Sequence, residues 1–536
     1  MTNYIQTDVF IAGGDPVGLL IAYCLARQAR QGVDSVLVEQ YVKKEQAMYG
    51  RATTLYPRTL ELLDQLDLLE DLNQIGYIGR NSVTYKDGKR VTSRGWHVMF
   101  ERMHGTFLDY CLNLRQKYLE EVIQGAYEKL GGQAFAGWKL ESYSVDNASG
   151  DDYKVTSHVR EIQTDRLLTV KGKYIVGADG GRSLVRRTAD IPFNGDHTKF
   201  KWVQLDHGVK RIGFAMTDAM IAKYGGKLTE EQAKEEAILS MHPFTLEFES
   251  VDWWTLYSIN QRVADTFFAN NRVLLAGDAC HTHSSGAAQG MNTRVHDAVN
   301  LAWKLGGMMK GWYKAAVLQT YDSERRPLAM RLIELDKAFS ATISGQVPDS
   351  HKDAYADSNE LFTKLFNETI QFNVGLGINY PENIINKALP TGMVSAGWRA
   401  PDALVYGLGS RVPTRLFHRT KNVGQWSIIV FAGQPALTRE IFAPAVKKLK
   451  EIADTLPSGM ARFLTLVAQS AAEGDQMFDT PKIGNVYYDQ DRSAHTAYTI
   501  STRSGAVAVL PPDGILGHAV FLDEIDSLVD FFKGFT

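Results

Sequence analysis

The sequence predicts an α/β protein built around a dinucleotide-binding βαβ unit, and three observations lead to this prediction. An apolar run from Thr7, a glycine-rich turn, an apolar helix-like stretch Leu19 to Ala26 and a second apolar run Ser35 to Glu39 open the chain. Two later segments, 174–180 and 272–278, each have the pattern of a buried strand that ends in a turn with an aspartate. At 536 residues the chain is too long for one hydrophobic core, so two or three packed units are expected.

Composition argues against several classes of protein. The 58 basic and 61 acidic side chains give a formal charge of -3, which points to neither nucleic acid nor an anionic membrane as partner. With 44% hydrophobic and 22% charged residues the chain has an ordinary globular composition, and no apolar run approaches the roughly 20 residues that span a bilayer. We expect a soluble protein with no nucleic-acid or membrane partner.

Cysteine usage and the first residues bear on the compartment. The only cysteines, Cys24, Cys111 and Cys280, are too few and too scattered for a disulfide framework or a cysteine-based zinc site. The N-terminus enters an apolar strand-like run almost at once and carries no secretory signal pattern. We therefore expect a reducing, cytoplasmic location.

The periodicity of apolar residues and the density of proline and glycine divide the rest of the chain into domains. Period-2 stretches within 201–257 predict a second sheet, and a long helical region is expected from about Met291 to Ile333. Proline and glycine density rises around 390–402, and beyond it Trp426 to Phe431, 443–453 and Ala506 to Leu510 predict a compact α/β domain. The expected domains are a discontinuous nucleotide-binding domain (1–186 and 265–345), a second sheet (187–264), a helical connector (346–396) and a C-terminal domain (397–536).

The first motif, residues 13–18, lies between strand and helix, where a G-x-G-x-x-G dinucleotide fingerprint belongs. Gly13 permits the tight turn and Gly18 close helix-to-strand packing, and the helix N-terminus favours a pyrophosphate. Asp15, however, takes the place of the middle glycine after Gly14, and its carboxylate should repel phosphate. Local chemistry offers a second interpretation, in which Asp15 is the N-cap and Pro16 the first helical residue.

Acidic residues end the strands that follow. Glu39 ends the second strand 26 residues after Gly13, where an acidic side chain accepts hydrogen bonds from an adenosine ribose; the alternative is a solvated strand-end glutamate. Asp179 and Asp278 follow the two later strands. The loop after Asp278 continues through 287–292 into a helix, so it offers an acceptor and then a row of backbone N–H donors.

A metal site is the alternative interpretation for His281 and His283, which are two residues apart. No nearby carboxylate cluster completes a ligand set, and a structural histidine is commoner. We therefore expect no metal. A C-terminal domain without cysteine is expected to make structural or dimer contacts and no redox contribution.

Taken together, these motifs resemble the flavoprotein aromatic hydroxylases of the para-hydroxybenzoate and phenol hydroxylase family. The resemblance rests on residues 13–18, Glu39, 50–52, 116–120, 179–180 and 277–278, and residues 280–284, 289–293 and 297–305 are particularly similar to the phenol hydroxylase branch. Residues 397–402 resemble the start of that branch's thioredoxin-like C-terminal domain, and 511–514 a turn near its end. The resemblance implies a Rossmann-like FAD-binding domain, a mixed-sheet substrate domain and a thioredoxin-like domain.

The resemblance also implies the reaction: NADPH or NADH reduces FAD, O2 is captured as a flavin C4a-hydroperoxide, and oxygen passes to a phenolic or polyketide-like aromatic ring. Glu39 is then expected at the adenosine ribose, Arg51 and Gln116 against the cofactor, and Asp278 at the ribityl chain. Backbone donors to the isoalloxazine ring are expected from Gly290, Met291 and Asn292. The full cofactor set is Gly13, Gly14, Asp15, Gly18, Glu39, Arg51, Gln116, Asp179, Asp278, Ala288, Gly290, Met291 and Asn292. A homodimer is expected from resemblance alone.

Three departures from the family pattern are Asp15 for a glycine, Ser285 for a proline and Ala288 for a glycine. The stretch 187–257 also looks short, as if strands were missing near 201–205. Candidate catalytic groups in the substrate pocket are His207, Arg211 and Tyr257, each with a structural alternative. Two other functions stay open: FAD-dependent oxidation without oxygen insertion, and a degenerate member that binds without catalysis.

Overall fold

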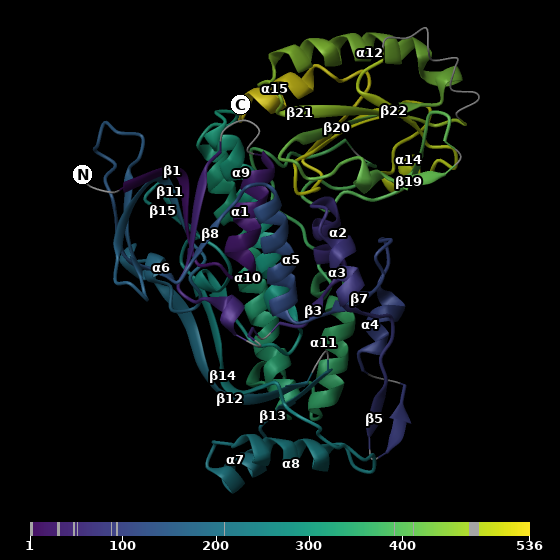
Figure 1. Ribbon diagram of the computed structural model, residues 1–536. Coiled ribbons are helices and arrows are strands. Elements are labelled where there is room, and N and C mark those ends of the chain that lie inside the picture. Colours follow the sequence, from purple (N-terminus) through teal and green to yellow (C-terminus); the bar gives the residue numbers. More distant parts are fainter. Residues whose placement is uncertain are drawn as a thin grey trace.

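The computed structural model describes residues 4–28, 33–46, 49–50, 52–86, 88–92, 95–207, 210–390, 392–410, 412–470 and 482–536. Figure 1 shows three layers along the long axis: the C-terminal domain at one end, a large sheet with its helices in the middle, and a second sheet at the other end. Within the described ranges no helix combines the length and the hydropathy needed to cross a membrane.

The middle layer is built on an eight-stranded sheet, and the predicted βαβ unit forms its centre. Strands β1, β2, β8, β11 and β16 run parallel, and β15, β10 and β9 add antiparallel pairs. The strands are β1 (Tyr4–Ala12), β2 (Ser35–Glu39), β8 (Ala134–Ala136), β9 (Trp138–Val145), β10 (Val155–Glu161), β11 (Leu167–Gly177), β15 (Phe268–Ala269) and β16 (Val273–Leu275). Since β1, β11 and β16 are neighbours, the loops that follow them meet at one edge.

Helices cover this sheet and extend away from it. The long helical region expected at 291–333 is two helices, α9 (Gln289–Met309) and α10 (Ala316–Ile343), because the chain turns at Gly311, whose φ is +68°. The other helices of this layer are α1 (Pro16–Gln28), α2 (Pro57–Gln65), α3 (Leu69–Ile75), α4 (His97–Arg102), α5 (Gln116–Lys129), α6 (Leu184–Thr188) and α11 (Ser358–Asn373). Two small sheets lie beside them: β3 (Thr54–Leu55), β7 (Cys111–Asn113) and β4 (Tyr77–Gly79) form one, and β5 (Thr84–Lys86) and β6 (Lys89–Val91) the other.

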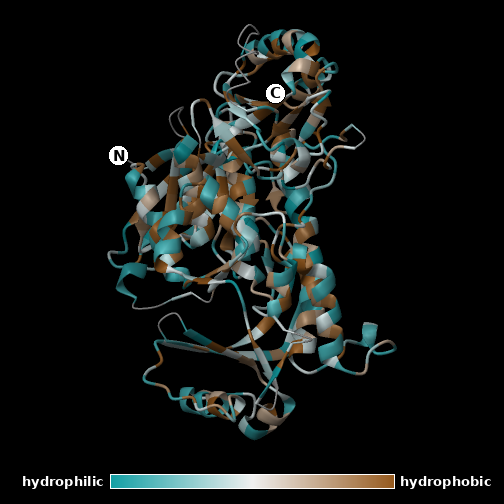
Figure 2. Ribbon diagram, turned by 90° about the vertical axis from the view of Figure 1, so that its right-hand side faces the viewer, coloured by the Kyte–Doolittle hydropathy of each residue, from teal (hydrophilic) through white to brown (hydrophobic). Residues whose placement is uncertain are grey.

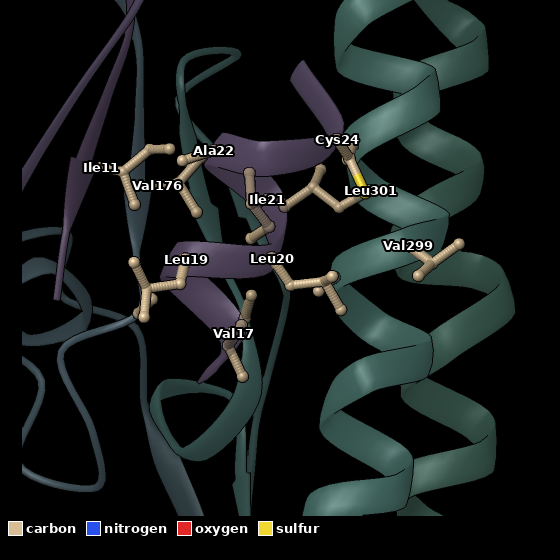
Figure 3. Close-up of a cluster of buried hydrophobic side chains, with 14 of the residues drawn as sticks. Ile11, Val17, Leu19, Leu20, Ile21, Ala22, Cys24, Val176, Val299 and Leu301 are labelled. Carbon is tan, nitrogen blue, oxygen red and sulfur yellow. The ribbon is translucent and has the colours of Figure 1, made fainter. Parts of the chain in front are cut away.

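The main hydrophobic core fixes α1 against both the sheet and α9. In Figure 3, α1 carries Leu19 to Ala22 between the strands that hold Ile11 and Val176 and the helix that holds Val299 and Leu301. All of these side chains are buried. Figure 2 shows the same division at larger scale, with brown, hydrophobic segments in the strands of the middle layer and teal, hydrophilic segments on the helices at the outside. This packing fixes the positions of the N-termini of α1 and α9, which both face the site described below.

The second sheet contains β13 (Lys210–Ala215), β12 (Phe193–His207), β14 (Trp253–Ala264) and β17 (His281–Thr282), in that order, with α7 (Asp218–Tyr224) and α8 (Glu230–Ser240) beyond it. Residues 201–205, where strands were expected to be missing, lie inside the long strand β12. Strand β17 comes from the loop after β16, so this sheet is joined directly to the edge where the parallel strands end.

The C-terminal domain has its own seven-stranded sheet of parallel and antiparallel strands. Its order is β19 (Pro413–Arg415), β18 (Leu404–Gly407), β22 (Asn485–Tyr488), β21 (Ala461–Val467), β20 (Trp426–Gly433), β23 (Ala506–Leu510) and β24 (His518–Phe521). Helices α12 (Pro435–Thr455), α14 (Ser493–Ala497) and α15 (Ser527–Lys533) complete the domain. The predicted α/β fold with a second sheet and a separate C-terminal α/β domain is confirmed. The prediction that the second sheet is mixed is wrong, because each of its described strand pairs is antiparallel.

Candidate functional site

A cavity of about 1030 Å³ opens where the parallel strands end. Asp15 follows β1, Gly181 follows β11 and Asp278 follows β16, and all three line the cavity. The first turn of α9 forms another wall through Gly290 and Met291. The carboxyl edge of a parallel sheet is where α/β proteins bind their ligands, and this cavity occupies that edge.

The first loop is packed so closely that only glycine fits at its key positions. At Gly13, with φ +107°, a Cβ would lie 2.2 Å from the carbonyl oxygen of Ala178. At Gly18 a Cβ would lie 1.9 Å from the carbonyl oxygen of Gly13. The loop therefore lies directly against the end of β11 and the first turn of α1, the close approach that a dinucleotide fingerprint requires.

Asp15 is the N-cap of α1. Its Oδ1 accepts hydrogen bonds from the backbone N–H groups of Val17, at 3.1 Å, and Gly18, at 3.2 Å. Burial raises the pKa of Asp15 to about 7, while Lys43 and the Gly18 N–H act in the opposite direction. The carboxyl group that occupies the place of a glycine is thus partly protonated near neutral pH.

A polar cluster lies beside the loop at the end of β2. Glu39 Oε2 accepts from the Gly14 N–H at 2.7 Å, and Lys43 Nζ donates to the Gly14 carbonyl at 2.9 Å and to Glu120 at 2.7 Å. Gln116, which lines the cavity, donates to Glu120 at 2.8 Å. The structure therefore brings Glu39 and Gln116 together at this end of the site. Arg51 lies outside the described residues.

Asp179 and Asp278 differ in what they face. Asp179 Oδ2 accepts from the N–H groups of Leu184, at 2.6 Å, and Val185, at 3.1 Å, so it is engaged with the start of α6 and does not line the cavity. Asp278 does line it, and its Oδ1 forms an ion pair with Arg294 of α9. Arg294 was missed by the sequence analysis, although its place four residues after Gly290 puts both residues on one face of α9.

The start of α9 presents backbone donors to the cavity. Its N-cap, Ala288, has φ +52° in the left-handed region that favours glycine, and it offers no side-chain acceptor to the first turn. The Asn292 side chain is turned to neighbouring backbone instead: it accepts from Tyr56 at 2.8 Å and donates to the carbonyl groups of Thr54, at 3.0 Å, and Ala288, at 2.8 Å. Asn292 thereby holds the loop that precedes the helix.

The histidines of the third motif are partnered inside the protein. His281 Nε2 bonds Asp297 at 2.7 Å, and Asp297 is also bonded by Arg325 at 2.8 Å. Burial lowers the pKa of His283, whose Nδ1 bonds the Ser284 carbonyl at 2.9 Å. Among the residues that the structure describes, no group of three potential ligands is placed to hold a metal ion.

A second cavity of about 480 Å³ adjoins the first and shares Gln204, Arg211 and Ser285 with it. Its walls are largely aromatic and aliphatic: Trp96, Trp202, Phe214, Ile343 and Phe362. At the junction, Tyr257 and Ser285 share a hydrogen bond, and Gln204 donates to Ser285 at 3.1 Å. Arg211 forms a bidentate ion pair with the buried Asp206: Nε donates to Oδ1 at 2.7 Å and Nη2 donates to Oδ2 at 2.6 Å.

Of the three candidate catalytic residues, the structure brings two to this junction. Arg211 and Tyr257 line the first cavity, whereas His207 does not. His207 Nδ1 shares a hydrogen bond with the Ser250 hydroxyl at 2.8 Å and lies 3.5 Å from Asp252 Oδ1. Neighbouring strand positions face opposite sides of a sheet, and Asp206, beside His207, is the residue that meets Arg211 across the β12–β13 pair.

Two family models match the chain. One, described as FAD binding domain, matches residues 6–224 and 206–336. The other, described as phenol hydroxylase C-terminal dimerisation domain, matches residues 481–536. The first covers more than half of the chain and includes every loop that lines the cavity described above.

The chain is similar along most of its length to known proteins. It is 28% identical over 459 residues to a phenol 2-monooxygenase of Aspergillus fumigatus, covering 74% of this chain and 75% of that protein. It is 28% identical over 578 residues to a 3-hydroxybenzoate 4-monooxygenase of Comamonas testosteroni, covering 96% of this chain and 85% of that protein. A solved structure of aklavinone-11 hydroxylase with FAD and aklavinone has the same fold, with a TM-score of 0.73 at 20% identity over 99% of both chains.

Proposed function

This chain belongs to the FAD-binding domain family and is a FAD-dependent monooxygenase, and we propose that it hydroxylates a neutral phenolic or polyketide-like aromatic compound with NAD(P)H as reductant and O2 as oxygen donor. When bound, FAD supplies the redox chemistry of reductant oxidation and oxygen activation. The chain itself supplies binding, orientation and exclusion of water.

One observation carries the cofactor assignment: the N-termini of α1 and α9 converge on a single cavity with two acidic residues, Asp15 after β1 and Asp278 after β16. The loop before α1 is a cradle that a Cβ at Gly13 or Gly18 would fill. The cavity also holds buried polar atoms without a hydrogen-bond partner among the described residues, Thr282 Oγ1 and His283 Nε2. Such atoms cost free energy unless a ligand satisfies them, so they support a bound polar group here.

We assign the ends of the cofactor from this geometry. The Glu39 and Gln116 cluster suits the adenosine ribose, since it provides carboxylate and amide groups beside the first loop. Asp278 is a charged acceptor for ribityl hydroxyls. The backbone N–H groups at Gly290 and Met291, at the positive end of α9, suit the flavin edge that gains negative charge on reduction. Asn292 acts indirectly, by holding the loop.

The substrate assignment rests on the adjoining cavity. Its aromatic walls favour a planar ring, and its opening to the flavin cavity passes Tyr257, Ser285 and Gln204, which offer hydrogen bonds to a phenolic hydroxyl. Arg211 is the charged side chain among its described lining residues, and Asp206 already balances that charge. An uncharged ring therefore matches this cavity better than an aromatic carboxylate.

Two further proposals concern assembly and location. The match to a dimerisation domain at residues 481–536 supports a homodimer. The three cysteines are all free, which supports a reducing, cytoplasmic location.

The test is to purify the protein, record its flavin absorbance and identify released FAD by chromatography. Oxygen uptake and NAD(P)H oxidation are then followed with a panel of neutral phenols and polycyclic aromatics under ¹⁸O2. We expect a yellow protein and a product that carries one ¹⁸O atom. A protein that takes up no FAD would contradict the assignment, and an oxidised product without ¹⁸O would favour oxidation without oxygen insertion.

A further inference from the structure

The first loop has almost no backbone donor left for a phosphate. Gly13 N–H donates to Val38 at 2.9 Å and Gly14 N–H to Glu39 at 2.7 Å. Pro16 has no N–H, and the next two N–H groups of α1 are bound by the Asp15 side chain. Within the described segment 4–28, this leaves the N–H of Asp15 itself for the pyrophosphate.

The same loop carries an ionisable carboxyl group at the cavity where a pyrophosphate would lie. Asp15 lines the cavity, and its ionised form opposes a pyrophosphate. The nearest lysine, Lys43, is committed to Glu120 at 2.7 Å and lies 3.9 Å from Glu39. A positive charge must therefore reach the phosphates from another element.

Arg294 on α9 is placed to supply that charge. It lines the cavity with Asp15, its guanidinium pairs with Asp278, and its charge acts on the Asp15 carboxyl group. The side chain lies close to Gly277, which follows β16, and to Gly290 in the first turn of α9: a Cβ at Gly277 would lie 3.6 Å from Arg294 Cγ, and one at Gly290 would lie 3.5 Å from a terminal guanidinium nitrogen. Its Nε is buried without a hydrogen-bond partner among the described residues.

We infer that Arg294 is a cofactor-binding residue that contacts the FAD pyrophosphate and replaces the charge and the donors that Asp15 removes from the first loop. This inference rests on the proposed FAD site. Of the five N–H donors of a guanidinium, those not engaged by Asp278 suit two phosphate oxygens at once, a geometry that lysine cannot copy. Arg294 thus joins α9 to α1 through the cofactor.

The test compares FAD with riboflavin, which has the same ring and ribityl chain but no phosphate. Apoprotein is titrated with each ligand and flavin fluorescence is followed for the wild type, Arg294→Met and Arg294→Lys. We expect Arg294→Met to weaken FAD by about 10- to 100-fold, as loss of a charge-assisted contact does, with a riboflavin affinity changed by less than about threefold. Arg294→Lys should lie between Arg294→Met and wild type.

Two controls keep the result specific. Arg272→Met removes a positive charge that lies over Tyr174, outside the cavity, and should leave FAD affinity unchanged. In Arg294→Met, adding Asp15→Gly removes the repulsion and frees two backbone donors, so affinity for FAD should recover by about tenfold or more. Circular dichroism of each apoprotein checks that the variants fold.

The outcomes separate this inference from the proposed function. A wild-type protein that binds no FAD would contradict the proposed function. Wild-type binding together with unchanged or tighter FAD binding in Arg294→Met and Arg294→Lys would overturn the role of Arg294 alone. Equal losses of FAD and riboflavin would also overturn it, because they would place the side chain against the ring or ribityl chain.

Discussion

At the scale of single residues, Asp15 combines two opposing effects. Its carboxylate caps α1 through the N–H groups of Val17 and Gly18, a contribution of about 0.5 to 2 kcal/mol relative to alanine. The same charge opposes a phosphate group in the cavity, and burial limits that penalty because it raises the pKa of Asp15 to about 7. Protonation therefore decides how much of the repulsion is present.

The first prediction concerns pH. A carboxyl group with a pKa of about 7 loses its proton as the pH rises through that value, so the repulsion grows with pH. We expect the FAD dissociation constant of the wild type to rise between about pH 6 and about pH 8, and Asp15→Gly to bind FAD about tenfold tighter at the upper end with little pH dependence. Fluorescence titration at both pH values measures this. Asp165→Gly, an exposed turn residue with φ +58°, serves as control.

Unchanged or weaker FAD binding in Asp15→Gly at the higher pH would contradict this account. It would mean that the phosphates lie away from the start of α1, or that the cap matters more to the loop than the charge.

The second prediction contrasts two residues of one loop. Asp278 lines the cavity as a charged acceptor, whereas His283 is held by the Ser284 carbonyl and burial lowers its pKa, which keeps it neutral. Asp278→Ala should therefore reduce FAD content more than His283→Ala, by the roughly 1.5 to 3 kcal/mol of a charge-assisted hydrogen bond. Flavin absorbance per protein in the two purified variants checks this, and equal content would refute the role given to Asp278.

At the scale of elements, the site is held by close approaches between backbone segments. The loop between β1 and α1 touches Ala178 after β11, and Gly277 after β16 has φ +65° and lies against Val17 of α1. Three segments that are far apart in sequence thus form one rigid edge. The addition of one methyl group at these contacts should lower the stability of the folded protein, because protein interiors are close-packed.

The third prediction tests this packing with two glycine substitutions in helices. In Gly18→Ala the new Cβ would lie 1.9 Å from the Gly13 carbonyl oxygen, so the loop must move. We expect a loss of about 1 to 3 kcal/mol in the free energy of unfolding and weaker FAD binding. Gly125→Ala on α5 is the matched control, because its Cβ meets nothing within 4 Å. That variant should be stabilised by roughly 0.5 to 1 kcal/mol.

Urea unfolding of both apoproteins and FAD titration measure these effects. If Gly18→Ala matched Gly125→Ala in both, the close approach would not constrain the loop.

At the scale of the whole molecule, the C-terminal domain is joined to the cofactor domain through buried polar contacts. The Asp513 carboxylate accepts from Asn300 at 3.0 Å and Trp303 at 3.1 Å, both on α9, and its carbonyl accepts from Arg58 at 2.6 Å. Glu61 of α2 pairs with Arg399 at 2.9 Å. Helix α9 therefore contacts the C-terminal domain at one end and the cofactor cavity at the other (Figure 1).

The fourth prediction concerns assembly. Because residues 481–536 match a dimerisation domain and residues 397–536 contain no cysteine, we expect this domain to make subunit contacts and no thiol chemistry. Light scattering at micromolar protein should give a mass near twice the 59.7 kDa of one chain. A mass of one chain at that concentration would rule out the dimer.

The sequence by itself determined the local elements of this protein and the family to which it belongs. The run 35–39 is the strand β2 and the run 506–510 is β23, because buried strands of a covered sheet show as unbroken apolar runs. The glycine turn with an N-capping aspartate before α1 was also visible, since a cap and its helix lie within four residues of one another. The region expected to be one long helical stretch, 291–333, is two helices, because the chain turns at Gly311, whose φ is +68°.

The tertiary structure alone decided which of these residues meet. Arg294 reaches Asp278 and acts on Asp15 only because α1 packs between the sheet and α9, an arrangement set by side chains hundreds of residues apart. Arg211 faces the cavity and His207 does not, because the register of β12 against β13 pairs Arg211 with Asp206. A shift of one residue reverses the face of every side chain in a strand, and the sequence pattern near His207 does not fix that register.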